Sequence, residues 1–133
     1  MPAAASPEGA VPVAPGVHWI GAFDPDLRNF DIILRTANGT SYNAYAVRGS
    51  DGVAIIDTVK LNFSETFFRR LESIADYDEI TTIVLNHLEP DHSGALPELL
   101  RRAPGATLLV SPQARLMLKG LLDPAELAGR IAF

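Results

Sequence analysis

The stretch TTIVLNHLEPDHSGALPELLRR, residues 81 to 102, decides how the chain is expected to fold. Its apolar beginning, TTIVLN, is typical of a buried strand, and its end, SGALPELLRR, predicts a short helix. Between them four potential metal ligands occupy six positions: His87, Glu89, Asp91 and His92. Open sheets flanked by helices commonly place ligand sites at the carboxyl ends of their strands. The stretch therefore predicts a strand, a functional loop and a helix.

The sequence around this stretch predicts a layered α/β fold. Upstream, four segments rich in β-branched and aromatic residues predict strands, and Asn38-Gly39 predicts a hairpin between the second and third. A change to helical spacing predicts a helix over about 64–75, and downstream the pattern predicts a strand, a helix and the start of another helix. The four upstream strands are VHWIGA, FDIILRT, SYNAYAV and VAIIDTV, and the downstream segments are ATLLV, PQARLMLKGLL and DPAELAGRIAF. We therefore expect an antiparallel meander followed by β-α-β-α.

Length and composition indicate one small domain and exclude several functions. The chain has 133 residues, which is room for one core, and we assign residues 17–133 to it. Residues 1–16, rich in Ala and Pro, are interpreted as a flexible leader that lacks the features of a secretory signal. A net charge of -5 without a basic stripe argues against nucleic-acid binding. No apolar stretch reaches the roughly 20 residues that span a bilayer, so a soluble protein is expected. The chain has no cysteine, which makes the cytoplasm its expected location.

The ligand types restrict the metal that the cluster can bind. The chain has no cysteine, so a metal must be bound by nitrogen and oxygen atoms. Imidazoles with two carboxylates suit iron, manganese or zinc, with iron or zinc preferred. If the segment after His87 stays extended, as Pro90 favours for Glu89, residues 87, 89 and 91 share one side. The spacing allows one metal bound by all four groups or two metals fed by one segment.

Other interpretations of these residues are open at this point. The cluster can be a polar strand end that meets water, although four ligand types in six positions make this the weaker reading. Ser93 beside His92 can suggest nucleophilic catalysis, but no GxSxG pattern accompanies it. Asp57 and Thr58 end a predicted strand and serve either as a polar terminus or as support for the cluster. His18 is expected to be a packing or surface residue.

The order of these segments resembles a known family. The stretches VHWIGAFDPDLRNFDIILRTANGTSYNAYAV, VAIIDTVK and NHLEPDHSGALPELL resemble the amino-terminal part of flavodiiron proteins, the A-type flavoproteins that reduce oxygen or nitric oxide. The resemblance covers roughly residues 17 to 118. Its most specific part is HxExDHSG, because the wider metallo-β-lactamase fold usually shows HxHxDH. Glu89 replaces the second histidine, and the family uses this carboxylate to favour iron.

The resemblance implies a site, a fold and a reaction. His87 and Glu89 are implied to bind one iron, Asp91 the second, and His92 the second iron in some members but not in others. The fold implied is the first half of an αββα sandwich. The chemistry implied is reduction of O2 to water or of NO to N2O at a non-haem diiron site. Electrons come from an electron-donor protein or from FMN in a flavodoxin-like domain of a partner subunit, and full-length members form homodimers.

The chain also departs from the family pattern. The family takes two further histidines and a bridging aspartate from later segments, whereas the only histidines here are His18, His87 and His92. No flavodoxin-like region is visible, so FMN is expected only in a full-length parent. We therefore expect an amino-terminal fragment that is inactive alone and carries an incomplete diiron site. The alternatives are an oxygen-binding diiron sensor without a flavin domain, and a zinc-dependent hydrolase of the metallo-β-lactamase fold.

Overall fold

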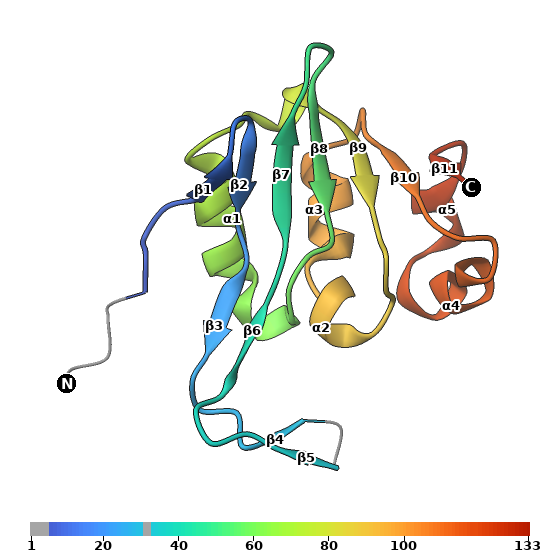
Figure 1. Cartoon of the computed structure of the whole chain (residues 1–133). Coiled ribbons are helices and arrows are strands. Elements are labelled where there is room, and N and C mark those ends of the chain that lie inside the picture. Colours follow the sequence, from blue (N-terminus) through green and yellow to red (C-terminus); the bar gives the residue numbers. More distant parts are fainter. Residues whose placement is uncertain (1–5, 31–32) are drawn as a thin grey trace.

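A mixed sheet forms the centre of the computed structural model, which describes residues 6–30 and 33–133 (Figure 1). The strand order is β1-β2-β7-β8-β9-β10-β11. Neighbours from β1 to β8 are antiparallel, and neighbours from β8 to β11 are parallel. The α/β class predicted from the sequence is confirmed. The bounds are β1 (Val11–Ala14), β2 (Val17–Trp19), β7 (Tyr45–Arg48), β8 (Val53–Ile56), β9 (Ile80–Val84), β10 (Thr107–Leu109) and β11 (Ile131–Ala132).

Between β2 and β7 the chain leaves the main sheet as a long ribbon. Strand β3 (Ala22–Asp24) pairs with β6 (Thr40–Tyr42), and β4 (Asn29–Phe30) pairs with β5 (Leu34–Arg35). The predicted strand over 30–36 is therefore wrong as a member of the meander, although its residues 31 and 32 lie outside the described part. The predicted hairpin is also wrong, because β5 and β6 pair with other strands. The described residues of β4 and β5 are exposed or half-buried, so they lack the covered face of a sheet interior.

The helices follow the predicted order with two differences. Their bounds are α1 (Ser64–Glu72), α2 (Pro90–Ser93), α3 (Leu96–Arg102), α4 (Ala114–Leu121) and α5 (Pro124–Leu127), with short 3-10 helices η1 (Leu61–Phe63) and η2 (Tyr77–Glu79). The predicted helix over 93–102 begins earlier, at Pro90, and is broken near Gly94. The last segment forms α5, as predicted, but it ends in strand β11, which the sequence did not indicate. Within residues 6–30 and 33–133, no helix is long and apolar enough to cross a membrane.

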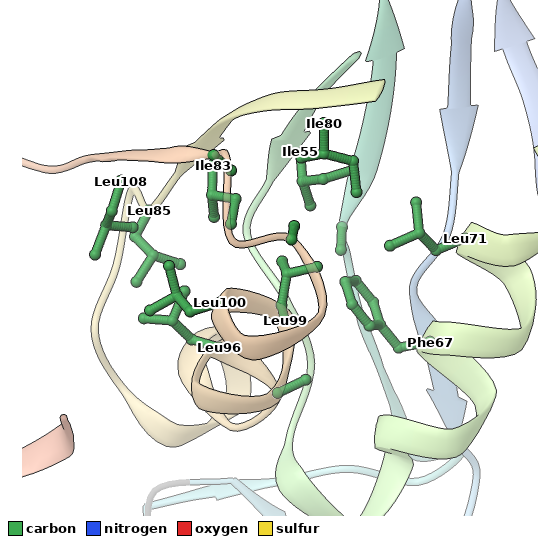
Figure 2. Close-up of a cluster of buried hydrophobic side chains, with 14 of the residues drawn as sticks. Ile55, Phe67, Leu71, Ile80, Ile83, Leu85, Leu96, Leu99, Leu100 and Leu108 are labelled. Atoms are coloured by element: carbon green, nitrogen blue, oxygen red, sulfur yellow. The ribbon is translucent and has the colours of Figure 1, made fainter. Parts of the chain in front are cut away.

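The core lies between one face of the sheet and the helices α1 and α3 (Figure 2). Ile55, Ile83 and Leu108 occupy matching positions on β8, β9 and β10, and all three are fully buried. Phe67 and Leu71 reach them from α1, and α3 contributes the buried side chains Leu96, Leu99 and Leu100. This packing fixes the ends of β8 and β9, which is where the candidate site begins.

The other face of the sheet carries an apolar row. Tyr45, Ile56, Val84 and Leu109 are in register on β7, β8, β9 and β10, one residue away from the row that faces the helices. The first three are half-buried, and Leu109 is 38% exposed. Both faces of the parallel strands are therefore apolar, as expected for strands that are covered on two sides.

The described part of the predicted leader is ordered by specific contacts, so the prediction of a flexible leader is wrong there. Strand β1 pairs with β2, and the backbone N–H of Ala10 donates to the hydroxyl of Ser73 at 3.2 Å. The fully buried Arg70 donates to the hydroxyl of Ser6 at 2.8 Å and to the carbonyl of Pro7. Residues 1–5 lie outside the described part. Contacts with distant residues outweigh the local Ala and Pro composition.

Candidate metal centre

The predicted cluster lies beyond the carboxyl ends of the adjacent parallel strands β8 and β9 (Figure 1). Glu89 is the last extended residue, and Pro90 begins α2, where its missing N–H has no partner to lose. The backbone N–H and the hydroxyl of Thr58 both donate to the carbonyl of His92, each at 2.8 Å. The end of β8 therefore supports the cluster segment directly, which resolves the role of Thr58 in favour of support.

The four predicted ligands come together as two pairs. Nε2 of His87 lies 3.2 Å from Oε1 of Glu89, and Nε2 of His92 lies 3.4 Å from Oδ2 of Asp91. The imidazole rings of His87 and His92 have centroids 5.3 Å apart. The expectation that residues 87, 89 and 91 share one side of an extended segment is wrong, because α2 takes over after Glu89. Pro90 does keep Glu89 extended, but it then opens a helix that brings Asp91 and His92 together.

Asp57 adds a fifth polar group behind the predicted four. Its carboxylate accepts a hydrogen bond from the backbone N–H of Asn86 at 2.8 Å, and Oδ2 lies 3.5 Å from Nδ1 of His92. The side chain is buried, and sequence reasoning had identified it only as a residue on the same rim. The structure therefore connects the end of β8 with both the beginning and the end of the cluster segment.

A second buried acid and a tyrosine lie next to the cluster, and sequence reasoning missed both. The hydroxyl of Tyr42 donates to Oδ2 of Asp24 at 2.6 Å, and both residues are buried. Burial, this hydrogen bond and the negative charges of Asp24 and Asp91 raise the pKa of Tyr42. Tyr42 also lines a cavity of about 170 Å³ together with Lys60, Glu89 and Asp91. Neither Tyr42 nor Asp24 is part of a sequence motif. They lie far apart in the sequence and come together only where β3 pairs with β6.

Ser93 does not have the environment of a nucleophile. Its hydroxyl donates to the carbonyl oxygens of Leu88 and Glu89 at 2.9 and 3.0 Å, and the residue is 1% exposed. Both contacts tie the hydroxyl to backbone carbonyl groups of its own segment. His18 lies on β2 opposite Ala46, consistent with the packing or surface role expected for it.

The chemical types of the four predicted ligands suit iron, but the number of ligands arranged together is too small for a complete site. Two imidazoles and two carboxylates are suitable ligands for iron, and Nδ1 of His92 is buried without a hydrogen-bond partner. Among the residues that the structure describes, however, no group of three or more His, Asp or Glu side chains is arranged to hold a metal ion. Two pairs can supply part of a coordination shell. The described residues by themselves do not complete one.

The metallo-beta-lactamase superfamily model matches residues 37–131 of the chain, which include the whole cluster. Two curated relatives carry the comparison further. The type A flavoprotein fprA of Rhodobacter capsulatus is 70% identical over 116 residues, which are 87% of this chain and 27% of that protein. The anaerobic nitric oxide reductase flavorubredoxin of Aeromonas salmonicida is 41% identical over 99 residues, 74% of this chain and 19% of that protein. The chain thus spans less than a third of either relative.

Solved structures agree with the sequence matches. The flavodiiron protein of Giardia intestinalis superposes with a TM-score of 0.79 at 30% identity, covering 88% of this chain and 28% of that one. The rubredoxin oxygen:oxidoreductase of Desulfovibrio gigas superposes with a TM-score of 0.82 at 28% identity, covering 92% and 30%. These matches confirm the resemblance found in the sequence. The chain belongs to the metallo-beta-lactamase superfamily, and the proteins that it matches include type A flavoproteins and flavodiiron proteins.

Proposed function

We propose that this sequence forms part of a flavodiiron oxidoreductase that reduces O2 to water, NO to N2O, or both. In this proposal His87, Glu89, Asp91 and His92 are iron ligands, and further ligands come from outside the described residues. FMN and an electron-donor protein belong to the complete enzyme, whose expected location is the cytoplasm. The proposal applies to the whole protein, and the chain alone is expected to be inactive.

One observation carries the proposal. The two donor pairs, His87 with Glu89 and Asp91 with His92, lie together at the carboxyl ends of adjacent parallel strands. The first pair contains a carboxylate where the wider superfamily usually has a histidine, and hard oxygen donors shift the preference of a site away from zinc. The names of the relatives and the solved structures reported above support the same reading. They do not favour the oxygen sensor or the zinc hydrolase.

The chain's own residues have roles in this proposal that do not depend on the metal. Tyr42 and Lys60 line the cavity beside Glu89 and Asp91, so they are placed to contact a small molecule that approaches the cluster. The Tyr42 hydroxyl is held by Asp24, and its raised pKa keeps its proton at neutral pH. The hydroxyl of Tyr42 and the amino group of Lys60 therefore both line the cavity beside Glu89 and Asp91.

The test is anaerobic calorimetric titration of the 133-residue chain with ferrous iron. We expect weak, saturable binding, because two donor pairs fix the coordination geometry poorly. The double variant His87→Ala, Glu89→Ala is expected to lose that binding. A double variant outside the cluster, at exposed Glu72 and half-buried Glu98 (Glu72→Ala with Glu98→Ala), is expected to keep it. Equal heats from all three proteins contradict the proposed ligands, and submicromolar affinity contradicts the incomplete site.

A further inference from the structure

Asp57 has an unusual backbone conformation at the edge of the cluster. Its φ is +60°, and it is the one non-glycine residue with positive φ among residues 6–30 and 33–133. Glycine adopts this left-handed conformation most easily, because the Cβ atom of any other L-residue crowds the backbone there. A residue that keeps its side chain at such a position needs a compensating contact. The contacts of the carboxylate show what that compensation is.

The carboxylate of Asp57 contacts both ends of the cluster segment. It accepts the backbone N–H of Asn86 at 2.8 Å and lies 3.4 Å from the side-chain nitrogen of Asn86. Its Oδ2 is 3.5 Å from Nδ1 of His92. The N–H of Asp57 itself donates to the carbonyl of Val84 at 2.8 Å, so the residue is held to the end of β9. The left-handed turn after β8 therefore directs one acid toward a single imidazole nitrogen.

The imidazole of His92 lies between two acids of unequal exposure. Nδ1 is buried, has no hydrogen-bond partner within normal limits, and lies beside Asp57, whose side chain is 10% exposed. Nε2 lies 3.4 Å from Oδ2 of Asp91, whose side chain is 18% exposed. A neutral ring carries one proton. If that proton sits on Nε2, the buried lone pair of Nδ1 faces a carboxylate, which costs more than the reverse arrangement.

We propose that Asp57 is a positioning residue that holds the single proton of neutral His92 on Nδ1. The lone pair of Nε2 is then directed toward Asp91, where a cation can be shared with that carboxylate. Carboxylates behind metal-binding imidazoles fix ring orientation and tautomer in this way. The part of the inference that gives Nε2 a ligand role rests on the proposed function. The position of the proton is a property of the metal-free chain and stands without it.

The substitution Asp57→Asn gives the sharpest test. Asparagine tolerates positive φ, and its carbonyl can still accept the N–H of Asn86, so the turn is expected to survive. Its amide can turn N–H donors toward Nδ1 of His92, which then must act as the acceptor. The proton is expected to move from Nδ1 to Nε2. A substitution that merely loosens the structure has no reason to exchange the two nitrogens.

The measurement is the nitrogen-15 NMR spectrum of the His92 ring in the metal-free 133-residue chain at alkaline pH. We expect Nδ1 to carry the proton in the wild-type chain, and the protonated and unprotonated nitrogen signals to swap in Asp57→Asn. Asp57→Gly, which removes the acid and suits the positive φ, is also expected to lose the Nδ1–H form. The matched control Asp24→Asn alters another buried acid and is expected to leave His92 unchanged.

The outcomes separate this inference from the proposed function. A wild-type ring protonated on Nε2, or the same protonation pattern in the wild type and Asp57→Asn, overturns the role of Asp57. The iron titration is a separate experiment on the same chain. Equal iron-binding heats from the wild-type chain and both double variants, together with the expected NMR result, overturn the ligand assignment alone. The same His92 tautomer in the wild type and Asp57→Asn, together with iron binding that only His87→Ala, Glu89→Ala loses, overturns the positioning role alone.

Discussion

Gly94 permits the closest backbone approach beside the cluster, and replacing it with alanine tests how tightly the segment is held. A Cβ at this position lies 2.3 Å from the backbone nitrogen of Leu61, 2.7 Å from the carbonyl oxygen of Val59 and 2.8 Å from the carbonyl carbon of Lys60. All three neighbours are backbone atoms of the loop after β8. A flexible side chain can rotate away from an added methyl group, but these atoms cannot.

Two opposing effects determine how much Gly94→Ala changes the free energy of unfolding. The backbone of Gly94 is helical, with φ of -59°, so alanine gains up to about 1 kcal/mol from its higher helix propensity. Overpacking costs about 1–3 kcal/mol, and overlap with three backbone atoms places this site at the upper end. The net expectation is a loss of about 2 kcal/mol in the free energy of unfolding. That corresponds to a melting temperature about 8 °C lower.

The assay is urea unfolding followed by circular dichroism, with Gly120→Ala as the matched control. Gly120 lies on exposed α4, where an added Cβ has no atom within 4 Å. This control is expected to gain about 0.5–1 kcal/mol from helix propensity alone. If Gly94→Ala is as stable as the wild-type chain, the close approach of α2 to the loop after β8 is refuted.

Three further perturbations test the packing and the electrostatics. Arg70→Ala is expected to lower the free energy of unfolding by about 3 kcal/mol, because the buried guanidinium donates to distant acceptors, whereas exposed Arg69→Ala changes it by less than about 0.5 kcal/mol in urea unfolding. The Arg48 guanidinium lowers the pKa of Glu79 to about 2. Its stabilising effect is present above the ordinary pKa of 4.5 and is lost as the pH falls toward 2, so Glu79→Gln is expected to flatten the dependence of the urea midpoint on pH in this range. Burial raises the pKa of Tyr77 to about 12, so stability is expected to fall as the pH rises from 10 toward 12, and less steeply in Tyr77→Phe. A pH dependence that the substitutions leave unchanged contradicts these two assignments.

Local patterns predicted the parts of the fold that depend on local physics. The run of apolar residues in β9 and the helical spacing in α1 are properties of short segments, and both were assigned correctly. The position of the cluster at the ends of parallel strands followed from those assignments. The chemistry of the residues alone had left the choice between several metals open. The family resemblance pointed to flavodiiron proteins and therefore to iron.

The errors have a common physical cause, which is contact between distant segments. Pro90 is compatible both with an extended segment and with the first turn of a helix. The structure shows the helix, and Thr58 on a distant segment contacts the carbonyl of His92 within it. Residues 1–16 were interpreted as a leader because their composition does not reveal contacts with distant residues. Strand β1 pairs with β2, and Arg70 donates to the carbonyl of Pro7. Tyr42 and Asp24 are 18 positions apart and carry no motif.

Backbone contacts between distant segments position the residues that carry the donors. Thr58 fixes the carbonyl of His92, and the N–H of Ala95 donates to the carbonyl of Val59 at 3.2 Å. Gly94 lets these chains approach, and the left-handed turn at Asp57 directs a carboxylate to the adjacent imidazole. These contacts hold the backbone on both sides of His92, so the fold fixes the segment that carries Asp91 and His92. Ordering these side chains then costs little on binding, and the remaining cost falls on the more exposed pair, His87 and Glu89.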